Sequence, residues 1–188
     1  MALAKILIYT LADLFRYSGQ PQFGILYIGC VDGMIQNHFT ATGIVFNSKK
    51  ELLMIHHNKL KVWLPPGGHI DENELPDDAV VREIYEETGI WVKIISENRG
   101  FSFSGEGCRE LATPFAILLE DIEGNGTHNH IDMVYLCEAV NEDLIPQENE
   151  VRGIGWFAYK EIEGLITFEN VRREISKAIE FMKNNAGM

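Results

Sequence analysis

The sequence predicts a mixed α/β fold in which a β-sheet lies between helices. Segments with strand-like patterns occupy the middle of the 188-residue chain, and turn residues separate them. Helical patterns are interleaved with these segments or follow them, and the chain contains no repeat and no low-complexity tract. The expected strands cover residues 40–46, 51–57, 91–95, 114–120, 131–139 and 154–157.

The first two of these strands are expected to form a hairpin. Residues 40–46 and 51–57 are separated by residues 47–50, Asn-Ser-Lys-Lys, which are typical of a turn. Residues 61–64 are expected to be short and extended. The Pro-Pro-Gly-Gly run of residues 65–68 is expected to end that segment.

A helix is predicted from Pro76 to the residue before Gly89. Proline suits the first helical position, and glycine suits the position just past the end. Asp77 and Asp78 fall in the first turn, where the helix dipole favours acids. Leu75, however, is a poor N-cap. One apolar side of this helix is formed by Val80, Val81, Ile84 and Thr88, with Tyr85 at its edge.

The two ends of the chain are expected to be helical. A short helix is predicted at residues 159–165 and a longer one at 169–184. Apolar residues at helical spacing between positions 3 and 15 predict an amphipathic N-terminal helix, which packs on the domain or on a second subunit and suggests a homodimer. Interspersed charges argue against a membrane span, and no signal-peptide cleavage site is recognisable. We therefore divide the chain into a helical extension, 1–36, and a main domain, 37–188.

Charge and cysteine content narrow the class of protein. The net charge of −12 argues against a general DNA or RNA binder, which needs a basic surface. A phosphorylated small molecule is not excluded, because a bound metal can reverse the local field. The three cysteines are widely spaced and form no Cys-x-x-Cys motif, which favours a reduced, cytoplasmic setting.

A 23-residue segment carries nine characteristic positions. They are Gly68, Glu74, Arg82, Glu83, Ile84, Glu86, Glu87, Gly89 and Ile90. Glu83, Glu86 and Glu87 have the spacing i, i+3, i+4, so a helix places them on one side. Carboxylates crowded in this way repel one another, and a divalent cation that also binds phosphate oxygens would explain their arrangement.

This segment resembles the Nudix box, and the resemblance extends loosely over residues 38–185. It implies an α/β/α sandwich around a mixed sheet, and hydrolysis of a nucleoside diphosphate linked to another moiety. Mg2+ or Mn2+ would be the cofactor. A nucleoside triphosphate, ADP-ribose or a nucleotide sugar is allowed as substrate, whereas RNA is disfavoured by the acidic charge. The alternative is a Nudix-fold module that binds a nucleotide without turnover.

The resemblance also implies roles for individual residues. Glu83, Glu86 and Glu87 would be metal ligands, with Glu83 as the general base in some family members, and the carbonyl of Gly67 would add a ligand. Arg82 would orient Glu83 through charge-assisted hydrogen bonds. Gly68, His69 and Glu74 are assigned to substrate binding, and Glu74 would steady the loop or reach the metal shell. Together Gly67 and Gly68 are expected to allow a tight turn and a close backbone approach that a Cβ atom would block.

Several other polar residues are weaker candidates. Glu148 and Glu150 precede Trp156, where many Nudix proteins place a further acid near the metal, but solvation at the surface explains them equally well. Asp132 is interpreted as a buried, hydrogen-bonded structural acid rather than such a ligand. The aromatic residues that could stack a base are interpreted as core residues; they are Trp63, Phe101, Phe103 and Tyr135.

The histidines are not expected to form a metal cluster. His56, His57, His69, His128 and His130 lack the spacing of a zinc site. His69 differs from the others because it follows Gly68 directly, so it is assigned a contact to substrate phosphate.

Overall fold

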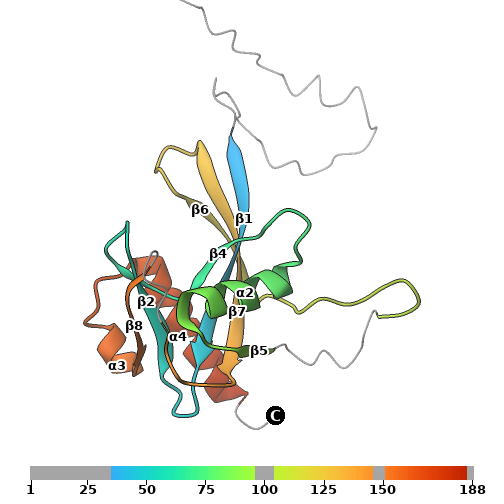
Figure 1. The fold of residues 1–188 in the computed structure, drawn as a ribbon. Coiled ribbons are helices and arrows are strands. Elements are labelled where there is room, and N and C mark those ends of the chain that lie inside the picture. The colour runs from blue at the N-terminus through green and yellow to red at the C-terminus, as the bar shows by residue number, and fades with distance from the viewer. Residues whose placement is uncertain (1–34, 96–103, 146–150, 186–188) are drawn as a thin grey trace, which may run out of the picture. The chain divides into compact units, whose positions relative to one another are not determined.

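The structure, a computed structural model, describes residues 35–95, 104–145 and 151–185. These residues form a mixed β-sheet between helices, which confirms the predicted fold class (Figure 1). The strands are β1 (Gln36–Phe46), β2 (Leu52–His57), β3 (Trp63–Leu64), β4 (Gly67–His69), β5 (Val92–Ile95), β6 (Ala116–Asp121), β7 (His128–Ala139) and β8 (Val151–Phe157). The helices are α2 (Pro76–Thr88), α3 (Tyr159–Ile162) and α4 (Glu169–Asn184).

The long strands β1 and β7 form the centre of the sheet. They pair in parallel along the whole length of β1, from Gln36 beside His128 to Phe46 beside Glu138. The main strand order is β3-β2-β1-β7-β5, while β4 pairs with β1, β6 with β7, and β8 with β2. Every strand pair other than β1·β7 is antiparallel in the described part of the chain.

The alternation of side chains along β1 builds a core on each face of the sheet. Ala41 and Val45 pack with Val80 and Ile84 of α2 on one face. Ile44 and Phe46 point to the other face, where they meet the apolar side of α4. That side is formed by Val171, Ile175 and Ala178. The two cores place α2 and α4 on opposite faces, as Figure 1 shows.

Most elements lie at or near their predicted bounds, and α2 and α4 match them at both ends. The main error concerns Gly67 and Gly68, which we expected to end an extended segment but which form β4 with His69. The backbone at Gly67 approaches β1 so closely that a Cβ atom there would lie 2.5 Å from the Ala41 carbonyl oxygen. Neither glycine needs the left-handed conformation. The close approach is therefore confirmed, but the tight turn is wrong.

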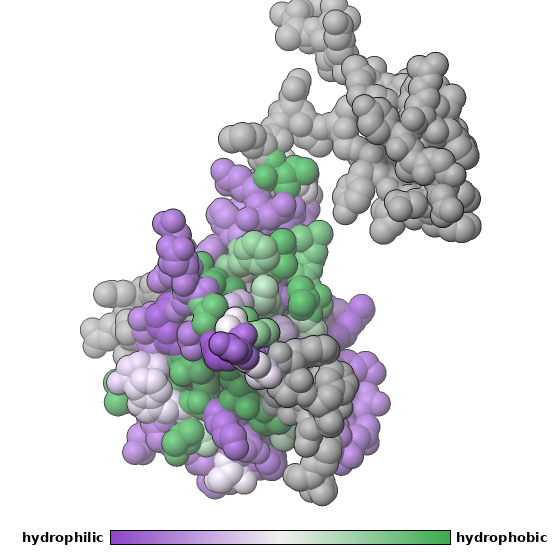
Figure 2. Space-filling model, turned by 90° about the vertical axis from the view of Figure 1, so that its right-hand side faces the viewer, coloured by the Kyte–Doolittle hydropathy of each residue, from purple (hydrophilic) through white to green (hydrophobic). Residues whose placement is uncertain are grey.

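The expected N-terminal helix lies outside the described residues. Within them, no helix is both long and apolar enough to cross a membrane. Some hydrophobic side chains are nevertheless exposed, including Phe39 of β1 and Ile117 and Leu119 of β6. On the side drawn in Figure 2, hydrophobic residues reach the surface among hydrophilic ones.

The end of α2 gives a direct test of the fold. Gly89 has a φ of 73°, and a Cβ atom on it would lie 2.8 Å from the Cβ atom of Ile145. Gly89→Ala is therefore expected to lower the free energy of unfolding by about 1–2 kcal/mol, as measured by urea denaturation. Gly105→Ala is the matched control because a Cβ atom there meets nothing within 4 Å. Equal stabilities for the two variants would contradict the described end of α2.

Candidate active site

The acidic side of α2 lies against β4. Glu87 is buried, and its Oε2 accepts a hydrogen bond of 3.0 Å from the backbone N–H of Gly67. Glu83 lies beside Gly68, where an added Cβ atom would come within 2.5 Å of the Glu83 carboxyl carbon. Glu86 is exposed to solvent. Two of the three box carboxylates, those of Glu83 and Glu87, thus converge on β4, the diglycine strand that contains Gly67 and Gly68.

The side chain of Arg82 forms hydrogen bonds with three acids of the motif, Glu74, Glu83 and Glu86. Its Nε and Nη2 donate to the two carboxylate oxygens of Glu74, at 2.7 and 2.8 Å. Its Nη1 donates to Glu83 at 2.8 Å and to Glu86 at 3.1 Å. Nη2 also reaches the backbone carbonyl of His69, at 3.0 Å. The guanidinium therefore fixes the Glu83 carboxylate and the loop that carries Glu74.

These contacts change the titration of the groups that make them. The hydrogen bonds from Arg82 lower the pKa of the Glu74 carboxyl below its usual value, although partial burial opposes them. In turn, the hydrogen bond to Glu74 is the main reason why the pKa of Arg82 is raised. Both groups are thus ionised at neutral pH. The carboxyl groups of Glu83 and Glu87 and the backbone of β4 supply oxygen atoms beside Gly68. Such a donor set fits a hard divalent cation.

A cavity of about 260 Å3 opens beside this strand on the α4 face. It is lined by Gly67, Gly68 and His69, and by polar groups from β1, β6, β7 and α4. Those groups are Thr40, Thr42, Glu120, His130, Asp132, Asn170 and Glu174. A larger depression of about 640 Å3 adjoins it, and His69 lines both. The diglycine strand therefore borders a space that could hold a ligand.

Asp132 is buried and accepts hydrogen bonds from Thr40 at 2.9 Å and Thr42 at 3.0 Å. It is hydrogen-bonded as the sequence predicts, but it also faces the cavity. Its pKa is raised by burial.

Two further acids, Glu120 and Glu174, line the same cavity and were not identified from the sequence. Burial, followed by the charges of Glu120 and Asp132, raises the pKa of Glu174 to about 7. Burial and the charge of Asp132 also raise the pKa of Glu120. Asn170 donates to Glu120 at 3.0 Å and to Glu174 at 3.3 Å. The cavity thus contains one carboxyl group, that of Glu174, that can donate as well as accept hydrogen bonds near neutral pH.

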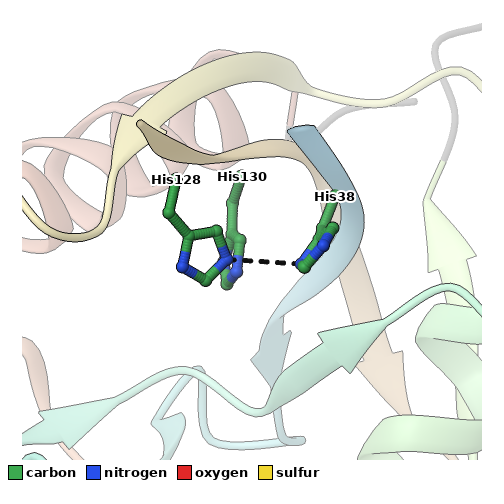
Figure 3. A group of neighbouring side chains, drawn as sticks. All are labelled: His38, His128 and His130. Atoms are coloured by element: carbon green, nitrogen blue, oxygen red, sulfur yellow. Dashed lines mark hydrogen bonds between the residues drawn. The ribbon is translucent and has the colours of Figure 1, made fainter. Parts of the chain in front are cut away.

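The histidines lie closer together in the fold than their spacing in the sequence suggests. The rings of His69 and His128 each contact the rings of His130 and of His38, which the sequence did not single out. Figure 3 shows three of these rings, carried by β1 and β7, turned toward one another. Their proximity is a finding of the fold, and the expectation that they form no metal cluster stays a prediction.

The other candidates do not join the site in the described structure. Glu148 and Glu150 lie outside the described residues, as do Phe101 and Phe103. Tyr135 is buried in the core, as expected. Trp63 packs edge-on against His56 and Phe157.

Comparison with known proteins now assigns the family. The sequence profile of the NUDIX domain matches residues 36–179, most of the chain. The chain belongs to the Nudix family. A solved structure of a NUDIX-family hydrolase from Clostridium perfringens is 29% identical and covers 79% of this chain and 99% of its own, with a TM-score of 0.69.

Two curated relatives are similar over shorter stretches. A probable DHNTP pyrophosphohydrolase from Lactococcus lactis subsp. cremoris is 30% identical over 118 residues, 63% of this chain. An RNA pyrophosphohydrolase from Bartonella tribocorum is 38% identical over 80 residues, 41% of this chain. The chain spans 61% and 44% of the lengths of these two relatives.

The raised pKa of Glu174 makes the stability of this Nudix domain depend on pH. At pH values between the usual pKa of glutamate and the folded value of about 7, the Glu174 carboxyl holds a proton in the folded chain that it has lost in the unfolded chain. This group therefore makes stability fall as pH rises through that window. Glu174→Gln is expected to flatten the fall in unfolding free energy between pH 5 and pH 7.5, as measured by urea denaturation.

Glu169→Gln provides the control for this measurement, because Glu169 lies on the same helix and is exposed. It is expected to retain the wild-type pH dependence. If Glu174→Gln also retained it, the buried position of Glu174 in the cavity would be contradicted.

Proposed function

We propose that this Nudix protein hydrolyses the pyrophosphate linkage of a nucleoside diphosphate joined to another moiety. The observation that carries the proposal is the convergence of Glu83 and Glu87 on the diglycine strand, beside a cavity. The nine box positions are complete, so no acid or glycine of the motif has been lost. The names of the two curated relatives support the same type of reaction, because both are pyrophosphohydrolases.

The proposed cofactor is Mg2+ or Mn2+. When bound, this cation supplies charge neutralisation for phosphate oxygens and activation of water. Glu83, Glu86, Glu87 and the carbonyl of Gly67 are the proposed ligands. Glu83 and Glu87 are the members of this set that lie against β4, which supports their position in it.

The role proposed for Arg82 is to orient Glu83. The hydrogen bond of 2.8 Å between them supports this role, and the paired bonds to Glu74 fix the guanidinium itself. Glu74 would therefore act through Arg82 and the loop, not by touching substrate. Gly68 would leave room for the Glu83 carboxylate, since a methyl group at this position would collide with it.

The proposed substrates are a nucleoside triphosphate, ADP-ribose or another nucleotide sugar. His69 follows the diglycine pair and lines the cavity, so it is proposed to contact a phosphate group. Asp132, Glu120, Glu174 and Asn170 could receive the hydrogen-bonding edge of a base or sugar. The net charge of −12 makes a long RNA chain the less favoured substrate. We also propose a cytoplasmic setting and a homodimer, neither of which the reaction requires.

Loss of either converging carboxylate is expected to abolish most of the activity. Glu83→Gln and Glu87→Gln should each lower the rate of magnesium-dependent phosphate-product release by at least about a hundredfold, the scale of losing a charge-stabilising group. The measurement is product release from a panel of nucleotide classes, with the products identified. Glu163→Gln removes an exposed acid beyond α3 and is expected to retain the wild-type rate.

Near wild-type rates in both variants would refute the assignment. Tight magnesium-dependent binding of a nucleotide, with no turnover of any compound in the panel, would favour a ligand-sensing module instead.

A further inference from the structure

Three histidines meet where β1 and β7 begin. His38 of β1 lies directly beside His130 of β7 in the parallel pair. His128 precedes His130 by two residues, so strand alternation places both on the same face of the sheet. Figure 3 shows the three rings converging, with a dashed line between His128 and His38.

The spacing of their ring nitrogens suits one metal ion. One nitrogen of each ring lies within 4.8 Å of those of the other two. In a tetrahedral zinc site, metal–nitrogen bonds of roughly 2.0–2.1 Å place ligand nitrogens about 3.3 Å apart. The Nε2 of His128 already lies 3.3 Å from the Nδ1 of His38. No separation would need to close by more than about 1.5 Å, which is within reach of side-chain rotation.

The ligand atoms determine the class of metal. Imidazole nitrogens suit zinc, nickel and copper, whereas magnesium and calcium prefer oxygen. We propose that His38, His128 and His130 form a binding site for a zinc-class transition-metal ion, separate from the carboxylate site on α2. This site shares no ligand with the proposed carboxylate site, because its histidines lie on the face of the sheet opposite α2. His69 and His130 also line the cavity that is proposed to receive the substrate.

The surroundings of the cluster support this proposal. The second ring nitrogen of His128, Nδ1, lies 3.9 Å from a carboxylate oxygen of Glu123. Histidine ligands commonly donate their second ring N–H to a carboxylate, and Glu123 lies near this position, although beyond hydrogen-bonding distance.

His69 adds a fourth imidazole and a connection to the Nudix box. Its ring centroid lies 5.3 Å from that of His38 and 4.9 Å from that of His130. It sits opposite Thr40 in the β1·β4 pair, whereas Gly68 sits opposite Ala41. The side chain of His69 therefore faces the histidines, while Gly68 faces Glu83 on the other side of the sheet. His69, the last residue of the strand that contacts the box acids, therefore lies beside the three-histidine site.

Zinc binding by the full chain tests this proposal directly. Isothermal titration calorimetry of the metal-free protein, with magnesium in excess to occupy the carboxylate site, is expected to show one zinc ion bound per chain. His38→Gln and His128→Gln should each weaken zinc binding by at least about tenfold, since even outer-shell changes cost that much. His56→Gln, a histidine on β2 outside the cluster, is the matched control and should bind like wild type.

Glu83→Gln separates this proposal from the proposed function. It should retain zinc affinity even though it loses hydrolysis, and no activity measurement enters the test. Wild-type zinc affinity in both cluster variants would overturn the proposal. Zinc affinity lost in Glu83→Gln but retained in the cluster variants would overturn it too.

X-ray absorption on the zinc-loaded wild-type chain keeps the test valid if a cluster variant fails to fold. At least three imidazole ligands per zinc ion are expected. A shell made only of oxygen ligands would contradict the proposal.

Discussion

The carboxylates of α2 can lie against β4 only because Gly67 and Gly68 have no side chains. At Gly67 a Cβ atom would collide with the backbone of β1, so β4 could not pair there without a shift. At Gly68 it would displace the carboxylate of Glu83, which Arg82 fixes from the other side. Both contacts thus impose the same steric constraint, which is that positions 67 and 68 must be glycine. The position of the acids, and with it the proposed cation site, depends on this constraint.

The short strand β4 connects two chemically different sets of groups, each of which is proposed to bind a metal. Gly68 faces the carboxylates of α2, and His69, one residue later, faces the imidazoles of β1 and β7. Oxygen donors suit hard cations and imidazole suits softer ones, so the two sets need not compete for the same metal. The hydrogen bond from Arg82 to the His69 carbonyl provides a short physical link between them. A metal on the histidine side would thus be one residue away from the proposed catalytic site.

The sequence predicts those features that depend on local patterns. Proline at the start of α2 and glycine after its end define that helix, and its acid spacing places the box carboxylates on one side. The sequence does not predict which strand pairs with β1. Its parallel partner, β7, follows about 90 residues later, and no local pattern links the two. The histidine cluster depends on that pairing, since His38 meets His130 only in this register. Glu174 was missed for a similar reason, because only the packing of α4 brings it to the cavity.

The most direct test of this account is the position of a manganese ion in crystals of the full chain soaked in Mn2+. Manganese gives an anomalous signal and can replace magnesium at sites built from oxygen ligands. The account predicts an anomalous peak between the carboxylates of Glu83 and Glu87, next to the diglycine strand. The absence of a peak there, with both carboxylates in place, would contradict the proposed cation site and the function that depends on it.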